Sequence, residues 1–386
     1  MERIKSKNIL LMYVMDFWGG CLFFLPVLAL YFEKSLYSAK NIAIIFAIEA
    51  ISVAIFDIPT GVLSDKLGRK NISIAAYGTL LLSVIVLLLA GNNMVMFIIY
   101  AALSGLSMAL GSGNGQSLIY DTLKEENKEN LYKKIIGISN SMWPLGASLS
   151  SILGGYLASK SLTTAIYFTL IPVGIAFILT FFLKEPKYKK SETSSFIHAK
   201  DAFKEIFRNK QLIILFIGGF LLMSIGESLH NFNSIFLNFK NLPIIYFGYF
   251  GAAMFGLSAL GHYIGHDVSE KFGNKSTLIL AVTFSPIIGL ASTLTHTYFS
   301  AILLSIPSIF FGIKNVVSDY LFNKNVLSSH RATINSILNS SNRIGIAVVV
   351  VFFGYLADLY SINTAFTIGF VLLLFVPILY LFVKDN

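Results

Sequence analysis

The chain has 386 residues, of which 55% are hydrophobic and only 13% are charged. Soluble domains carry about 25% charged residues, so this composition and a mean hydropathy of +0.72 exclude an ordinary soluble protein. The net charge of +9 is dispersed over many short connections, which argues against a nucleic-acid partner.

Apolar segments long enough to cross about 30 Å of hydrocarbon as helices recur from one end of the chain to the other. We therefore expect an all-α membrane protein with twelve transmembrane helices, at residues 8–31, 40–60, 70–90, 94–123, 132–158, 162–184, 210–238, 243–268, 275–295, 298–323, 330–358 and 362–383. Prolines inside these segments are expected to kink their helices. They are Pro26, Pro144, Pro172, Pro286 and Pro307.

Positive charge is unevenly placed between the two sets of alternating connections. Of the 29 Lys and Arg residues, most precede the first span, lie in every second connection or follow the last span, and only Lys34, Lys40, Lys160 and Lys240 fall in the other connections. Because Lys and Arg near span ends are retained in the cytoplasm, we predict a multi-pass protein of the cell (inner) membrane with both termini cytoplasmic. The single cysteine, Cys21, excludes an intramolecular disulfide.

A polar and basic connection divides the spans into six and six. We expect an N-terminal six-helix bundle at residues 1–184, a cytoplasmic linker at 185–210 and a C-terminal six-helix bundle at 211–386. Short matches relate the halves: GGYLAS at 154–159 aligns with FGYLAD at 353–358, and SDKLGRKN at 64–71 aligns with SEKFGNKS at 269–276. Parallel repeats of six spans are known in one large class of secondary transporters.

The connection after the second span carries an unusual number of charges and glycines, GVLSDKLGRKN at 61–71. With it the chain resembles the major facilitator superfamily of secondary transporters, whose loop signature is Gly-x-Leu-x-Asp-x-x-Gly-Arg-Lys. The signature residues here are Gly61, Leu63, Asp65, Gly68, Arg69 and Lys70. The resemblance implies two pseudo-symmetric six-helix bundles joined by this loop's contacts.

In such proteins this loop acts as a conformational latch. The resemblance implies that Asp65 meets a helix start from the other half, which SSHRATIN at 328–335 would supply, and that Arg69 pairs with Asp121. A carboxylate is favoured at a helix N-terminus, so making and breaking the contact would bias a two-state equilibrium. The alternative is that Lys66, Arg69 and Lys70 only set the topology.

A second, partial signature lies in the fifth span. Exporters of the superfamily that exchange substrate against protons often carry a glycine pattern there, and Gly137, Gly146, Gly154 and Gly155 have its spacing, while serines replace its central Gly-Pro. Together with DIPTGVLSD at 57–65 and GSGNGQSLIYDTLK at 111–124, this pattern looks most like the bacterial drug-efflux branch. Small residues also let helices approach closely, so packing against the eighth span is the alternative.

Ionisable groups within spans are candidate functional sites because burying them in hydrocarbon is costly. The acids in question are Asp16, Glu49, Asp57 and Glu227, and the bases are Lys314 and Arg343. The resemblance implies that spans one, four, seven and ten line the transport path. Glu227 is our first choice for a proton or cation site, with His230 one turn later on the same face, and an ion pair of Glu227 with Lys314 or Arg343 is the alternative.

Two cations in the second half could instead hold an anionic or zwitterionic cargo. Polar residues that could face the path include Asn114 and Gln116 in the fourth span, and Asn335, Asn339 and Asn342 form a stripe in the eleventh that continues to Arg343. These residues leave uptake or exchange of an organic anion or zwitterion through Lys314 and Arg343 open as an alternative to efflux.

One motif suggests a different class of protein. His262 and His266 lie four residues apart, a spacing compatible with metal ligation, but the Glu of a His-Glu-x-x-His motif is missing. A membrane metalloenzyme or sensor is thus a distant alternative. We expect a monomeric secondary active transporter, not an enzyme, that needs no cofactor or metal. Its partners would be protons, the lipid bilayer and a small-molecule substrate, and the leading expectation is export of an amphipathic drug-like compound against protons.

Overall fold

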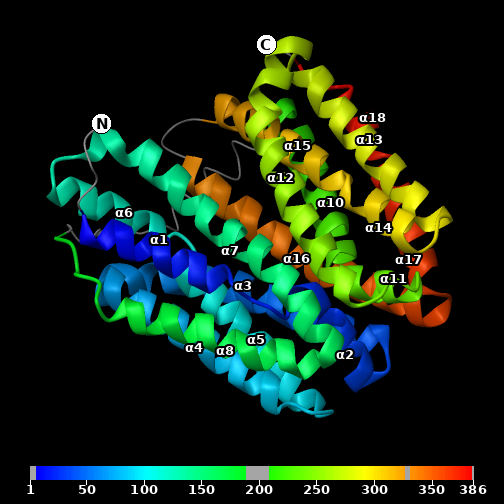
Figure 1. Cartoon of the computed structure of the whole chain (residues 1–386). Coiled ribbons are helices and arrows are strands. Elements are labelled where there is room, and N and C mark those ends of the chain that lie inside the picture. Colours follow the sequence, from blue (N-terminus) through cyan, green and yellow to red (C-terminus); the bar gives the residue numbers. More distant parts are fainter. Residues whose placement is uncertain (1–5, 188–207, 327–330, 385–386) are drawn as a thin grey trace. The chain divides into compact units, whose positions relative to one another are not determined.

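The computed structural model describes residues 6–187, 208–326 and 331–384, and within these ranges it is helical without any strand. The helices are α1 (Lys7–Gly20), η1 (Leu25–Val27), α2 (Leu28–Leu36), α3 (Ala39–Leu67), α4 (Arg69–Leu89), α5 (Met94–Gly111), α6 (Asn114–Glu125), η2 (Glu129–Leu131), α7 (Tyr132–Lys160), α8 (Leu162–Thr180), α10 (Lys210–Asn231), α11 (Asn233–Phe239), α12 (Ile245–Phe272), α13 (Asn274–Leu294), α14 (Thr297–Ser305), α15 (Pro307–Asn325), α16 (Arg331–Leu359), α17 (Ile362–Leu373) and α18 (Val376–Tyr380) (Figure 1). Most of the predicted linker, residues 188–207, lies outside the described ranges.

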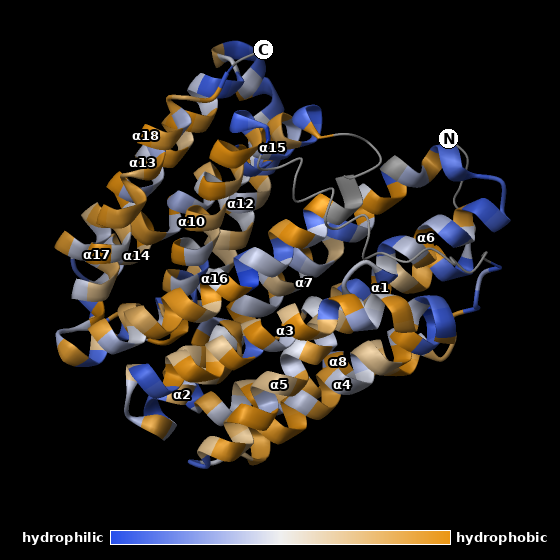
Figure 2. Ribbon diagram, turned by 180° about the vertical axis from the view of Figure 1, so that it is seen from behind, coloured by the Kyte–Doolittle hydropathy of each residue, from blue (hydrophilic) through white to orange (hydrophobic). Residues whose placement is uncertain are grey.

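Each predicted span coincides with one helix or with two or three consecutive helices. Among the described residues, ten helical stretches are long and apolar enough to cross a membrane, and the remaining two predicted spans are the long helices α7 and α12. Hydrophobic residues run along most helices, whereas hydrophilic ones gather at helix ends and in connections (Figure 2). The all-α fold predicted from composition is confirmed.

Several spans are broken rather than continuous. Pro26 lies in the short 3₁₀ helix between α1 and α2, and Pro307 is the first residue of α15. Proline fits the first turn of a helix because its missing N–H is unneeded there. Between α5 and α6, Gly113 adopts a φ of +69°, which a residue with a side chain seldom does. Pro144, Pro172 and Pro286 lie inside α7, α8 and α13.

The chain forms two compact units. The first comprises residues 1–36, 48–192 and 244–252, and the second comprises 37–47, 193–243 and 253–386. Two long helices are divided between the units. The first residues of α3 belong to the second unit, and the first residues of α12 belong to the first unit.

Close packing in the first unit depends on glycine. A Cβ atom added to Gly146 of α7 would meet the backbone of Phe17 in α1, and one added to Gly20 of α1 would meet the backbone of Trp143 in α7. Gly155 faces Gly248 at the start of α12 in the same way. Small residues thus bring these helices into backbone contact, as is usual between membrane helices.

In the second unit α10 packs on α16, and α13 packs on α15 and α17. One apolar core includes Leu212 of α10, Leu278 of α13 and Leu321 of α15, all of which are buried. Gly289 of α13 lies against the ring of Phe370, so a side chain there would displace the ring. This packing fixes the helices around the pocket described below.

The weak sequence repeat corresponds to a shared backbone turn in the two units. Gly68 precedes α4 with φ +97° and ψ 153°, and Gly273 precedes α13 with φ +81° and ψ 152°. In each turn the glycine N–H donates to the carbonyl of the serine four residues earlier, Ser64 or Ser269. The alignment of 64–71 with 269–276 is therefore a structural equivalence.

Candidate functional site

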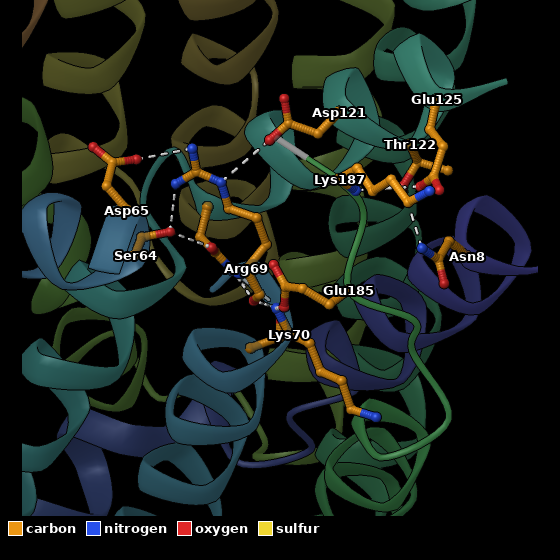
Figure 3. A network of polar contacts seen from close by, with 12 residues as sticks. Asn8, Ser64, Asp65, Arg69, Lys70, Asp121, Thr122, Glu125, Glu185 and Lys187 are labelled. Atoms are coloured by element: carbon orange, nitrogen blue, oxygen red, sulfur yellow. Dashed lines mark hydrogen bonds and ion pairs between the residues drawn. The ribbon is translucent and has the colours of Figure 1, made fainter. Parts of the chain in front are cut away.

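Arg69 is the centre of a polar cluster at the junction of α3 and α4 (Figure 3). Its guanidinium lies 2.9 Å from Asp65, 3.4 Å from Asp121 of α6, and 2.7 Å from the hydroxyl of Ser64, to which it donates. The arginine fork suits such multiple contacts. The structure thus brings Asp65, Arg69 and Asp121 together. The predicted helix start for Asp65 lies partly outside the described residues, because 327–330 are not described.

Asn114 is part of the Arg69 cluster. Its side-chain oxygen accepts from Ser64 at 2.7 Å, and its amide donates to the Arg69 carbonyl at 3.1 Å and to Ser73 at 3.0 Å. It is buried at the first turn of α6. Gly61, by contrast, is exposed, and a Cβ atom added there would have no neighbour within 4 Å, so the structure gives no steric reason for glycine at this position.

The N-terminus of α4 is capped by Glu185, a residue that sequence reasoning did not single out. Its two carboxylate oxygens accept from the backbone N–H groups of Arg69 at 2.7 Å and Lys70 at 2.8 Å. The Lys70 ammonium donates to the carbonyl of Phe181 at 2.8 Å. An added Cβ at Gly68 would come 2.8 Å from the Glu185 carboxyl carbon, so the signature glycine provides room for this cap.

Asn8 fixes the end of α8 to the start of α1. Its side chain donates to the Lys184 carbonyl at 2.8 Å and accepts from the Lys184 N–H at 2.9 Å, and it also donates to Thr122 of α6 at 3.2 Å (Figure 3). The segment that carries Glu185 is thereby held in place beside α4. No sequence motif marks this contact, because it joins residues 176 positions apart.

A second carboxylate cap lies in the second unit, at the N-terminus of α3. Asp358, near the end of α16, accepts from the Ser38 hydroxyl at 2.7 Å and from the backbone N–H groups of Ala39 at 2.7 Å and Lys40 at 2.9 Å. A negative charge is stabilised at a helix N-terminus, where the first N–H groups lack helical partners. Sequence analysis used Asp358 only as part of the repeat alignment.

Asp16 lies in the interior of the first unit. Its carboxylate accepts from Tyr77 of α4 at 3.1 Å and from Ser139 of α7 at 2.7 Å. No Lys, Arg or His nitrogen within the described part of the chain forms an ion pair with it. The carboxylate is therefore held by hydroxyl groups alone, an arrangement that tolerates both a charged and a protonated acid.

Glu49 of α3 accepts a hydrogen bond from Ser104 of α5. Gly105, the next residue, allows the α5 backbone to approach the Glu49 carbonyl closely. The side chain of Glu49 is only partly buried. It therefore lies in the first unit with Asp16, at the contact between α3 and α5.

Glu227 and His230 line one pocket in the second unit. The pocket has a volume of about 250 Å³ and is bounded by residues of α10, α11, α12, α13, α14, α15 and α17. His230 Nδ1 lies 3.1 Å from the side-chain nitrogen of Asn233, which also donates to the sulfur of Met254 at 3.5 Å. The helical spacing predicted from sequence thus brings Glu227 and His230 to one cavity.

Lys314 lies in the same unit and is only 6% exposed. Its ammonium is 5.0 Å from the ring centre of Phe311, a pocket residue, and it interacts electrostatically with Glu227 and Asp319. Within the described ranges neither Glu227 nor Arg343 forms a salt bridge with it or with each other. Among the described residues, Glu227 therefore does not form the ion pair with Lys314 or Arg343 that we considered as an alternative.

The other polar candidates are more exposed. Gln116, Asn335 and Asn339 are exposed, whereas Asn342 is partly buried and its side-chain oxygen has no hydrogen-bond partner among the described residues. Arg343 is partly buried beside it. An unpartnered buried oxygen usually marks a place where water or a ligand binds. Of the residues in the stripe, Asn342 is therefore the best candidate to bind one.

His262 and His266 form no metal site with other residues of the described ranges. His262 Nδ1 lies 2.8 Å from the Ser258 carbonyl, and His266 Nε2 lies 3.5 Å from Glu270, with the His266 and Glu270 side chains 70% and 71% exposed. The described residues contain no group of three or more His, Cys, Asp or Glu side chains that could hold a metal ion.

The fold and the Arg69 cluster are those of a multi-pass membrane protein with two helical units. The family profile described as Major Facilitator Superfamily matches residues 9–323, so the chain belongs to this family of transporters. It is 25% identical to YxaM, an uncharacterized MFS-type transporter of Bacillus subtilis, over 94% of this chain and 93% of the relative. It is also 25% identical to the quinolone resistance protein NorA of Staphylococcus aureus, over 82% of each.

Solved structures share the fold at low identity. The nucleoside transporter NupG superimposes with a TM-score of 0.78 at 16% identity, covering 97% of this chain and 98% of that one. A bacterial homologue of the human lysosomal transporter Spinster also gives 0.78 at 16% identity, covering 98% and 97%. Both structures are of transporters, and of the two only NupG has a name that states a substrate, a nucleoside.

Proposed function

We propose that this chain is a secondary active transporter that exports a small amphipathic organic molecule by alternating access, driven by inward movement of protons. The observation that supports the coupling is Asp16, an acid inside the first unit whose hydrogen bonds in the described ranges come from the hydroxyl groups of Tyr77 and Ser139. The similarity to NorA, a quinolone resistance protein, supports efflux and the drug-efflux branch. We further propose that the protein works as a monomer.

Proton binding to Asp16 fits its surroundings. An ionised carboxylate away from water is costly unless it is paired, and protonation removes the charge. Tyr77 and Ser139 can donate to the charged acid, and a hydroxyl oxygen can accept from the protonated acid. The site can therefore load and release a proton without rebuilding its contacts. Glu227 is the corresponding acid in the second unit, and we propose that it binds the cargo or a proton.

The distribution of Lys and Arg supports a place in the inner membrane with both termini in the cytoplasm. In that orientation the Arg69 cluster faces the cytoplasm, and the Asp358 cap on α3 faces outward. The segment Gly61–Lys70 is the latch of this cycle. Asp65 exchanges partners as the transporter changes state, and Arg69 is its partner in the present state.

The experiment uses the purified chain in proteoliposomes with an imposed pH gradient. Uptake of a fluorescent amphipathic dye into these proteoliposomes should collapse with a protonophore and be lost in Asp16→Asn. Glu129→Gln, an exposed acid of the same unit, is the matched control and should transport like the wild type. Dye movement that is unaffected by the protonophore and by Asp16→Asn would overturn the coupling.

Lys314 favours a second candidate function, exchange or uptake of an organic anion or zwitterion. A buried ammonium that lacks a salt bridge within the described chain could bind an anionic group of the cargo. In this case organic anions should compete with transport, and Arg343→Ala or Lys314→Met should abolish it without any effect of the pH gradient. Retention of dye export in both variants would exclude this candidate.

A further inference from the structure

The carboxylate and the side-chain amide that line the pocket around Glu227 come from α10 and α11. Glu227 contributes a carboxylate, and Asn233 contributes an amide whose nitrogen is already used by His230 and Met254. The side-chain oxygen of Asn233 is thus the atom that it can offer to a ligand. Two oxygen acceptors together suit a ligand group with several N–H donors and a positive charge.

Apart from His230 and the hydroxyl groups of Ser258, Ser285 and Ser308, the rest of the wall is apolar, and part of it is aromatic. Phe255, Phe311, Phe366 and Phe370 line the pocket. Phe366 and Phe370 lie edge to face with ring centres 6.1 Å apart, and Phe311 already has the Lys314 ammonium 5.0 Å from its centre. A volume of about 250 Å³ is below the usual range of pockets for drug-sized molecules, which begins at about 300 Å³. The space is that of a molecule with a single ring.

We propose that this pocket binds a small primary arylalkylamine, with its ammonium group against Glu227 and Asn233 and its ring among the phenylalanines. The inference rests on the proposed transport function, since it names the class of cargo that Glu227 would select. All the pocket residues belong to the second unit, so this binding needs no residue of the first unit.

The charges around the site are consistent with this choice. Glu227 is the only carboxylate among the described pocket residues, and His230 is the only basic one. Lys314 does not line the pocket, but its charge acts on Glu227 from α15. It partly offsets the carboxylate, which disfavours cations of higher charge and favours a monocation. A carboxylate ligand would meet Glu227 and be repelled.

The test is equilibrium binding to the full chain in detergent, without a membrane or a gradient, by isothermal titration. The probes are 2-phenylethylamine, its neutral analogue 2-phenylethanol and the anionic 3-phenylpropionate. We expect the amine to bind about tenfold to a hundredfold more tightly than the alcohol, as is typical of a hydrogen bond to a charged group. In Glu227→Gln this preference should disappear, whereas in Glu270→Gln, an exposed acid of the same unit, it should persist.

A second pair of variants tests the pocket without changing charge. Gly226 lines the pocket, and a Cβ atom added there has no neighbour within 4 Å, so Gly226→Leu should fill the space without a clash. Gly219→Leu, on the same helix and equally free of neighbours, is the control because Gly219 does not line the pocket. We expect Gly226→Leu to abolish binding of both the amine and the alcohol, while Gly219→Leu binds them normally.

The proposal is wrong if the wild type binds amine and alcohol equally, or if Gly226→Leu still binds the amine with wild-type affinity. The latter result decides the matter even where Glu227→Gln fails to fold. Amine binding without any flux in proteoliposomes would overturn the transport proposal alone. Proton-driven dye export by a protein that does not bind the amine would overturn only this inference.

Discussion

Removal of the Arg69 side chain should destabilise the first unit by about 3 kcal/mol. Asp121 and Arg69 are mostly buried, with side chains 15% and 13% exposed, so an unneutralised Asp121 costs about 1 to 3 kcal/mol. Asp65 is 39% exposed and can regain water, which limits its share to less than about 1 kcal/mol. Ser64 loses its donor but keeps Asn114, a loss of about 1 kcal/mol.

The two tryptophans make this measurement specific to the first unit. Trp18 lies in α1 and Trp143 in α7, and both belong to this unit. Tryptophan fluorescence during SDS titration in mixed micelles therefore reports the unfolding of the unit that contains Arg69. The variant is Arg69→Ala, and Lys66→Ala, an exposed cation of the same connection, is the matched control.

Two further variants resolve the separate contacts of Arg69. Asp121→Asn should cost more than Asp65→Asn because its side chain is less exposed, although its distance to Arg69 is longer. Coupling energies from double-mutant cycles with Arg69→Ala should have the same order. If Arg69→Ala differs from Lys66→Ala by less than about 1 kcal/mol, the cluster contributes little to stability and the reasoning from burial fails.

Three other predictions concern the capped helix starts. Glu185→Ala should destabilise the first unit by about 1 to 2 kcal/mol, since two N–H groups of α4 lose their acceptor, and the same fluorescence titration measures it. Gly68→Ala should lower the free energy of unfolding by about 2 kcal/mol or more, because Gly68 has a positive φ and lies close to Glu185. The control Gly91→Ala, with a positive φ but open space around it, should lower it by about 1 kcal/mol. Equal losses would show that the approach to Glu185 adds nothing. Asp358→Asn should lower the melting temperature in detergent by a few degrees relative to the control Asp267→Asn, which corresponds to a loss of about 1 kcal/mol in stability. Equal melting temperatures would show that the cap on α3 adds no stability.

The transmembrane helices could be predicted from sequence because hydrophobic length alone specifies them. Every predicted span has its helix, with small differences at the ends. Kinks were expected at Pro26 and Pro307, and the structure has helix breaks there, since proline opens a helix more readily than it continues one. The break at Gly113 was not expected, because a glycine within an apolar segment does not reveal its φ.

The Arg69 cluster was partly predictable, since its signature is contiguous in the sequence. Arg69, Asp65 and Asp121 were named in advance, but Glu185 and Asn8 were not. Their contacts depend on where the ends of α8 and α1 meet α4 and α6. Such contacts between distant segments leave no local pattern, and the same holds for Asp358 on α3. The pocket around Glu227 likewise needs residues of seven helices.

The glycine turn occurs in both units, once with a buried arginine cluster and once without it. Gly68 and Gly273 have nearly the same backbone angles and the same serine carbonyl contact, so the turn forms in both units. Only the first carries the buried arginine cluster; in the second, Asn274 stands at the position of Arg69, and Glu270 pairs instead with His266 at an exposed site. Because the second turn forms without the cluster, the backbone does not need it. Arg69, Asp65 and Asp121 therefore have a role other than turn formation. The proposed transport cycle assigns such a role to Asp65.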